Sequence, residues 1–199
     1  MTGQFPRPRK TLGQNFLADQ NIILKILRAA ELAANDHVLE VGPGRGALTD
    51  LLATRVKQLI AVEFDRDLAA MLRQRFRNTD QVTIVEQDIL KADFGSLLAG
   101  GSFKVVANLP YNISTPVLFR FLEERHHFSK LVVMLQKEVG DRLAAKPDTS
   151  AYGVLTVLFS QWFDVKREFV VAPGCFFPAP KVDSVLLSLV PLAVSRVEV

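Results

Sequence analysis

The sequence contains very little cysteine and no long hydrophobic run. Cys175 is the only cysteine in 199 residues, so the chain has no internal disulfide, which favours a reducing compartment. No stretch reaches the roughly 18–20 consecutive apolar residues of a membrane-spanning helix. The first ten residues carry charge but lack the apolar core of a secretory signal. We therefore expect a cytoplasmic protein with no membrane partner.

Excess charge is also scarce, and all of it lies near the N-terminus. The net charge is +3, yet residues 1–28 hold five basic side chains against Asp19 alone, so the remainder is slightly acidic. A basic arm suits contact with phosphate groups. A solvated tail explains the same charge equally well.

Short apolar runs alternate with segments of helical periodicity along most of the chain. This alternation predicts an α/β fold, with a mostly parallel seven-stranded sheet covered by helices on both faces. The connection between the last two strands is too short for a crossover helix, so we expect an antiparallel last strand. The predicted strands are 37–41, 58–64, 82–86, 103–107, 130–135, 165–171 and 184–190. The predicted helices are 19–34, 46–55, 65–77, 114–124, 136–145 and 151–162, the last favoured on length alone.

A glycine turn follows the first predicted strand, in the segment E-V-G-P-G-R-G-A-L-T of residues 40–49. Gly42 and Gly44 allow a tight turn and a close approach of the backbone to a ligand. The spacing is G-x-G-x-G, and Ala47 stands where a dinucleotide fingerprint would need its third glycine. Taken alone, the turn is also compatible with a purely structural role.

Acidic residues end the next two predicted strands. Glu63 lies 21 residues after Gly42, where a carboxylate accepts hydrogen bonds from both hydroxyls of a ribose. Asp88 closes the following strand, where its carboxylate accepts from an adenine amino group. Because open α/β sheets bind ligands at the carboxyl ends of their strands, these features predict an adenosine-containing cofactor. Without a third glycine or a P-loop lysine, S-adenosylmethionine is favoured over NAD.

The fourth predicted strand ends in A-N-L-P-Y-N-I-S-T, residues 107–115. Asparagine and proline are ordinary turn residues, so a simple turn is one interpretation. The other is a pocket for an extruded base. The Asn108 side-chain oxygen and the Leu109 carbonyl would accept hydrogen bonds from an exocyclic amine, Pro110 would fix the backbone, and Tyr111 would stack on the ring. Asn112, Ser114 and Thr115 are predicted to cap the next helix.

Four segments together resemble the ribosomal RNA adenine N6,N6-dimethyltransferases, the KsgA family. They are G-Q-N-F-L (13–17), E-V-G-P-G-R-G-A-L-T (40–49), N-L-P-Y-N-I-S-T (108–115) and F-F-P-A-P-K-V-D-S (176–184). The resemblance extends from about residue 9 to residue 191 and implies a class I, Rossmann-like methyltransferase fold. It also implies transfer of two methyl groups to adenine in small-subunit ribosomal RNA during ribosome biogenesis.

The resemblance assigns roles to individual residues. It implies a basic arm with a cofactor-contacting segment at 1–18 and a methyltransferase domain at 19–199. The cofactor-binding set would be Asn15, Leu17, Gly42, Gly44, Glu63, Asp88, Ile89 and Asn108. The set acting on the target adenine would be Asn108, Leu109, Pro110, Tyr111 and Phe176, the last stacking on the second face of the base. Family members usually continue into a helical C-terminal domain, so we expect a catalytic domain without that part.

Three other functions compete with this one. A large-subunit ribosomal RNA dimethyltransferase conferring antibiotic resistance would share the same core, although Leu109 and G-Q-N-F-L favour the small-subunit enzyme. A non-catalytic RNA-binding relative is disfavoured by intact Asn108, Pro110 and Tyr111. A nicotinamide oxidoreductase is disfavoured by the glycine spacing. The histidines have no partners at metal-ligand spacing in the sequence, so we expect no metal, and we expect a monomer.

Overall fold

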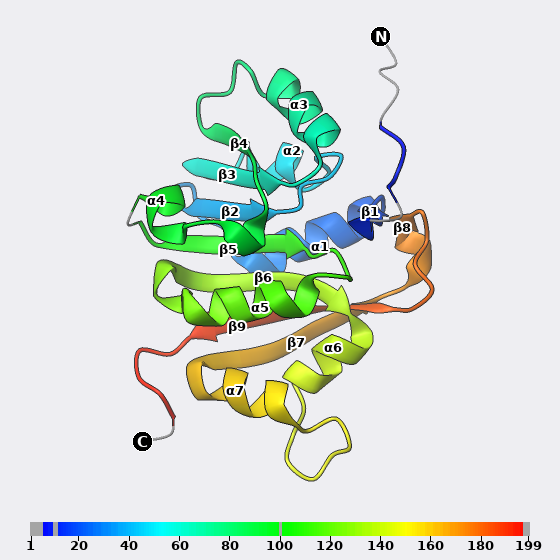
Figure 1. Ribbon diagram of the computed structural model, residues 1–199, viewed down its shortest axis with the longest axis vertical. Coiled ribbons are helices and arrows are strands. Elements are labelled where there is room, and N and C mark those ends of the chain that lie inside the picture. Colours follow the sequence, from blue (N-terminus) through cyan, green and yellow to red (C-terminus); the bar gives the residue numbers. More distant parts are fainter. Residues whose placement is uncertain (1–5, 10–11, 100, 197–199) are drawn as a thin grey trace.

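The computed structural model describes residues 6–9, 12–99 and 101–196, and Figure 1 shows a large main sheet with helices on both faces. The sheet strands are β2 (His37–Val41), β3 (Gln58–Glu63), β4 (Val82–Glu86), β5 (Phe103–Asn108), β6 (Phe128–Gln136), β7 (Phe163–Val171) and β9 (Ser184–Pro191). The helices are α1 (Gln20–Ala30), α2 (Thr49–Leu52), α3 (Arg66–Arg75), α4 (Phe94–Leu98), α5 (Ser114–Glu123), α6 (Lys137–Leu143) and α7 (Val154–Trp162). The predicted α/β fold is confirmed.

The order of the sheet is β4-β3-β2-β5-β6-β9-β7. Strands β4 to β6 are parallel, while β9 lies between β6 and β7 and is antiparallel to both. The predicted antiparallel last strand is therefore correct. In the register of the parallel strands, Val41 of β2 faces Val62 of β3 and Ala107 of β5. The carboxyl ends of these three strands consequently lie level with one another at one edge.

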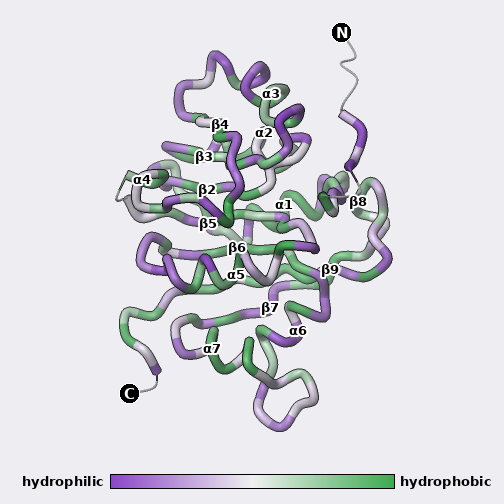
Figure 2. The backbone as a smooth tube through the Cα atoms, in the orientation of Figure 1, coloured by the Kyte–Doolittle hydropathy of each residue, from purple (hydrophilic) through white to green (hydrophobic). Residues whose placement is uncertain are grey.

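Alternate strand residues point into two separate hydrophobic cores. Val105 belongs to the core that α4, α5 and α7 cover, and its neighbour Val106 belongs to the core under α1 and α2. The strands are therefore apolar on both faces, as expected for a doubly covered sheet. Figure 2 accordingly shows the hydrophobic colour concentrated along the central strands such as β6, and more hydrophilic backbone around α3.

The ends of several helices differ from the prediction. Asp19 caps α1, as predicted, by accepting hydrogen bonds from the backbone N–H groups of Asn21 (2.8 Å) and Ile22 (3.1 Å). The predicted helix 46–55 is much shorter, because the glycine turn keeps a positive φ as far as Gly46 (85°). The predicted side-chain cap of α5 is wrong. Its N-cap position is Ile113, which makes no side-chain cap bond.

A short two-stranded ribbon, which the sequence did not predict, lies beside the main sheet. It joins β1 (Phe16–Leu17) to β8 (Phe176–Phe177) in antiparallel pairing. A strand of two residues is too short to show a periodic pattern in the sequence, and the two strands are far apart along the chain. The ribbon joins the N-terminal segment to residues 176–177, which precede β9 in the chain. None of the described helices has the length and apolarity needed to cross a membrane.

Close packing of α6 on β9 gives a test of the fold. A Cβ added to Gly140 would overlap Cγ1 of Val185, so Gly140→Ala should lower the unfolding free energy by about 1–3 kcal/mol despite alanine's better helix propensity. Gly95→Ala, in α4, meets only the Asp93 carboxylate at 3.4 Å and should be neutral or stabilising. Urea unfolding of both variants makes the comparison. Equal stability of the two variants would contradict the close packing.

Candidate functional site

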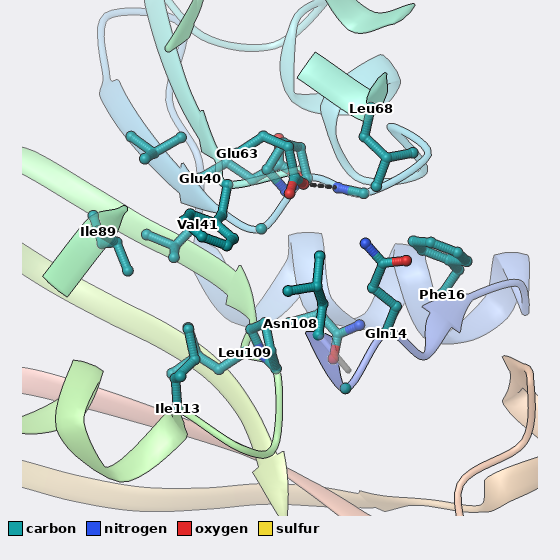
Figure 3. A pocket seen from close by; sticks show the side chains of 18 of the residues that line it. Gln14, Phe16, Glu40, Val41, Glu63, Leu68, Ile89, Asn108, Leu109 and Ile113 are labelled. Carbon is teal, nitrogen blue, oxygen red and sulfur yellow. Dashed lines mark hydrogen bonds between the residues drawn. The ribbon is translucent and has the colours of Figure 1, made fainter. Parts of the chain in front are cut away.

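A cavity of about 240 Å³ opens at the carboxyl edge of β2, β3 and β5. Its walls come from four parts of the chain: the N-terminal segment, the glycine turn, the ends of β3 and β4, and the turn after β5. Its lining includes residues 12–17, 40–45, 62–64, 87–90 and 108–113. In Figure 3, Glu40 and Glu63 lie along one wall, and Asn108, Leu109 and Gln14 lie across the cavity from them.

The glycine turn brings the N-terminal segment close to the sheet. Gly44 has φ 58°, and a Cβ at this position would lie 2.9 Å from Cδ1 of Phe16. Only glycine combines this conformation with such a close approach. The Gly44 backbone N–H donates to Oε2 of Glu63 (3.0 Å), which ties the turn to the end of β3. The turn therefore has a role in building the cavity wall.

Glu63 is a buried carboxylate at the centre of this wall, with 6% exposure. Its Oε1 accepts from the Asp65 backbone N–H (2.8 Å), and its Oε2 accepts from Gly44. Burial raises the pKa of Glu63, while these backbone donors oppose the rise. Each carboxylate oxygen can accept more than one hydrogen bond, so both remain able to receive ligand hydroxyls.

Glu40 is a second buried acid on the same wall, only 1% exposed. Burial raises the pKa of Glu40 to about 8, the Glu63 carboxyl adds to the rise, and the Thr49 hydroxyl opposes it. Within the described part of the chain, Oε2 of Glu40 has no hydrogen-bond partner. The Glu40 carboxyl is therefore enclosed behind the cavity surface and keeps its proton near neutral pH.

The N-terminal segment forms the opposite wall and is held by polar contacts. The Gln14 side chain donates to Asp65 (2.9 Å), and Arg9 pairs with Asp67 (2.5 Å). Arg9 is thus engaged within the protein, whereas the sequence left open whether this basic arm contacts phosphate groups or is a solvated tail. Arg7 is exposed, and Lys10 lies outside the described residues.

Asn108 contacts the N-terminal segment directly. Its Nδ2 donates to the carbonyl of Asn15 (3.1 Å), 93 residues earlier in the chain. With the amide nitrogen engaged in this way, the side-chain oxygen Oδ1 is the group left to accept hydrogen bonds from a ligand. Leu109 is buried, and its backbone N–H donates to Met134 of β6 (3.2 Å). This bond extends the β5–β6 ladder into the turn and holds the turn against the sheet.

Asp88 and Ile89 line the end of the cavity beside β4. Oδ1 of Asp88 accepts from the Leu90 backbone N–H (3.0 Å) and begins a short 3-10 helix. Ile89 is 4% exposed and presents an apolar wall next to this carboxylate. An acid beside an apolar surface is typical of a site for a flat ring that carries an amino group.

The structure brings together all but one of the residues that the sequence assigned to a site. Phe176 is not among the residues that line the cavity; it is 5% exposed and packs in the core with Leu17, its partner in the β1–β8 ribbon. The neighbouring Phe177 is 58% exposed, and the Arg45 guanidinium lies 5.6 Å from its ring centroid. The residues that do line the cavity are Asn15, Leu17, Gly42, Gly44, Glu63, Asp88, Ile89, Asn108, Leu109, Pro110 and Tyr111.

Sequence reasoning missed several lining residues. Glu40 lies inside a predicted buried strand, where an acid is unusual, and that anomaly was the available signal. Phe64 directly follows Glu63 and is 60% exposed at the rim. Gln14 lies in a segment without periodicity, so only its neighbours in the G-Q-N-F-L motif pointed to it.

A cluster of potential metal ligands lies at the other end of the sheet, near the start of β6. Glu124, His126 and His127 offer ligand atoms within 4.8 Å of one another, a proximity that the sequence did not predict. Arg120 also contacts Glu124 (3.4 Å) and competes for its carboxylate. These three residues do not line the cavity. The expectation that the protein binds no metal stays a prediction.

Comparisons with known proteins agree on one family. The model of the ribosomal RNA adenine dimethylase family matches residues 6–198. The ribosomal RNA small subunit methyltransferase A of Geobacter metallireducens is 56% identical over the whole chain, which spans 74% of that protein's length.

Two solved structures are also similar. A dimethyladenosine transferase from Plasmodium falciparum has a TM-score of 0.80 and 32% identity, with 89% of this chain and 63% of that one covered. The 23S rRNA methyltransferase ErmE has a TM-score of 0.79 and 31% identity, with 93% of this chain and 73% of that one covered.

The buried acid Glu40 predicts a pH dependence of stability. Its folded-state pKa of about 8 lies above the ordinary 4.5, so the folded state keeps a proton that the unfolded chain releases. Stability from this group is complete below pH 4.5 and is lost as pH rises towards 8, by about 1.4 kcal/mol per pH unit. Glu40→Gln, which cannot ionise, should gain stability relative to the wild type over this range.

Urea unfolding at several pH values, without ligand, measures the difference between the two proteins. Glu138→Gln is a suitable control because this side chain is 77% exposed on α6. It should show no comparable trend. A constant difference between Glu40→Gln and the wild type from pH 5 to pH 8 would mean that Glu40 is already ionised in the folded protein.

Proposed function

Since the chain belongs to the ribosomal RNA adenine dimethylase family, we propose that it transfers two methyl groups from S-adenosylmethionine to the N6 amine of adenine in small-subunit ribosomal RNA. The observation that carries this proposal is the orientation of Asn108. Its Nδ2 donates a hydrogen bond to the Asn15 carbonyl, and its Oδ1 is left to accept a hydrogen bond from an amine in the cavity. Glu63 and Asp88 line the same cavity.

The cavity fits the proposed cofactor by the chemistry of its walls. In the proposal, Glu63 accepts from the ribose hydroxyls, Asp88 accepts from the adenine amino group, and Ile89 packs against the ring. The remaining contacts, from Asn15, Leu17, Gly42 and Gly44, surround the methionine part. When bound, S-adenosylmethionine supplies an electrophilic methyl group on a sulfonium.

The residues after β5 are proposed to act on the target amine. An adenine amine is a poor nucleophile because its lone pair is delocalised into the ring. Asn108 Oδ1 and the Leu109 carbonyl accept its two N–H groups and so favour the tetrahedral nitrogen that reacts. Pro110 fixes the backbone that aims the Leu109 carbonyl, and Tyr111 provides a stacking face. The product ammonium is acidic and releases its proton to water, so no strong base is required.

A stacking role for Phe176 has less support than the other assignments, because its ring lies in the core. The proposal therefore rests on Tyr111 for the contact with the base. Residues 1–18 are proposed as the cofactor-contacting segment, of which residues 12–17 line the cavity. A ribosomal RNA substrate implies a cytoplasmic enzyme that contributes to ribosome biogenesis, and we propose that it acts as a monomer without a metal.

The competing function is methylation of large-subunit ribosomal RNA, and the similarity to the 23S rRNA methyltransferase ErmE supports it. The chain is 56% identical to a small-subunit methyltransferase and 31% identical to the 23S enzyme, which favours the small subunit. Labelled S-adenosylmethionine offered with unmethylated small and large subunits separately tests the choice. We expect dimethyladenine in the small-subunit RNA. Label only in the large subunit would reverse the assignment, and label in neither would favour a non-catalytic RNA-binding protein.

Substitution of Asn108 tests the chemistry. Asn108→Ala should reduce methyl transfer by about 100-fold or more, because its acceptor acts mainly on the reacting amine. Affinity for S-adenosylmethionine, measured by calorimetry, should fall much less than the transfer rate. Asn35→Ala, at an exposed position away from the cavity, is the matched control. Wild-type transfer rates in Asn108→Ala would exclude the role given to this side chain.

A further inference from the structure

A hydrogen bond links two of the sequence motifs beside the cavity. The Tyr111 hydroxyl lies 2.6 Å from Oγ of Ser184, which is 73 residues later and ends the F-F-P-A-P-K-V-D-S segment. The Ser184 side chain is fully buried, whereas Tyr111 is partly exposed and lines the cavity. The phenol ring thus reaches from the cavity wall to an anchor inside the protein.

The anchor is rigid because of its place in the sheet. Ser184 is the first residue of β9 and pairs with Gln136 of β6 on one side and with Val171 of β7 on the other. The preceding Asp183 carbonyl also accepts from the Lys137 backbone N–H (2.9 Å). A residue held on both sides by neighbouring strands has little freedom to move its hydroxyl.

Tyr111 is also held at its other end. The Ser114 hydroxyl donates to the Tyr111 carbonyl (3.2 Å), so the backbone and the ring tip are each fixed by a serine. Burial raises the pKa of Tyr111, with the bond to Ser184 opposing the rise, so the phenol stays neutral and remains able to donate. These two contacts fix the direction of the ring's long axis, from Cβ to the hydroxyl, and so fix where the ring lies against the cavity.

We propose that Ser184 is a positioning residue for methyl transfer, which orients the Tyr111 ring to stack on the target adenine. This inference rests on the proposed function. A stacking contact needs a ring held in a defined place, and an untethered ring must be ordered when the base binds, which weakens binding of the base. The serine at the end of F-F-P-A-P-K-V-D-S thereby acts through a residue of N-L-P-Y.

A double-mutant cycle tests the proposal with the full chain and a methylatable ribosomal subunit. Ser184→Ala and Tyr111→Phe each remove this hydrogen bond and keep the ring. Each should lower kcat/KM for RNA by about fivefold to tenfold, the usual effect of one hydrogen bond, with unchanged affinity for S-adenosylmethionine. The double variant should be no worse than either single variant. A merely structural role of Ser184 would give losses that add.

Ser188→Ala is the matched control. Ser188 lies four residues further along the same strand, is 4% exposed, and makes a comparable hydrogen bond to Glu168 (2.7 Å). This variant should keep the wild-type kcat/KM even where its stability falls. If Ser184→Ala does not fold, Tyr111→Phe still breaks the bond from the cavity side, and its wild-type kcat/KM would overturn the proposal.

The same assay separates this inference from the proposed function. No transfer by the wild-type protein to any ribosomal RNA would refute the proposed function. Transfer by the wild type together with wild-type kcat/KM in Ser184→Ala, or with additive losses in the double variant, would overturn only the role of Ser184.

Discussion

The buried carboxylate of Glu63 connects most of the cavity. It accepts the backbone N–H of Gly44 and so fixes the glycine turn after β2 against the end of β3. The fixed turn leaves room for the Phe16 ring, which lies where a Cβ on Gly44 would clash. Phe16 in turn pairs with Phe177 in the β1–β8 ribbon, and the chain then continues to Ser184. Burying an acid is costly, and the two backbone donors oppose the rise in the Glu63 pKa that burial causes.

The parts that the sequence predicted are those set by local periodicity. Strands β2 and β4 have the predicted bounds, and the acids at 63 and 88 and the asparagine at 108 all line the expected edge. Residues that are far apart in the sequence come together here because parallel strands all place their carboxyl ends at the same edge of the sheet. Residue identity at a strand end is therefore a reliable guide to a site in an open α/β sheet.

The parts that the sequence did not predict depend on contacts between distant segments. The insertion of β9 between β6 and β7, the β1–β8 ribbon and the bond from Asn108 to Asn15 leave no periodic signal. Phe176 is the one assigned site residue that does not line the cavity. The motif points to an aromatic ring near the base, but a strand turns alternate side chains to opposite sides. In this ribbon Phe176 packs in the core, and Phe177 is the exposed ring.

The charge distribution of the cavity follows from the proposed reaction. Acids line the wall assigned to the cofactor, whereas the acceptors assigned to the amine, Asn108 Oδ1 and the Leu109 carbonyl, are neutral. Neutral acceptors act mainly as the nitrogen becomes tetrahedral. After one transfer the amine retains a single N–H, so the second methylation depends on one acceptor while the other faces a methyl group. Two neutral acceptors tolerate that exchange, because neither leaves a buried charge unpaired.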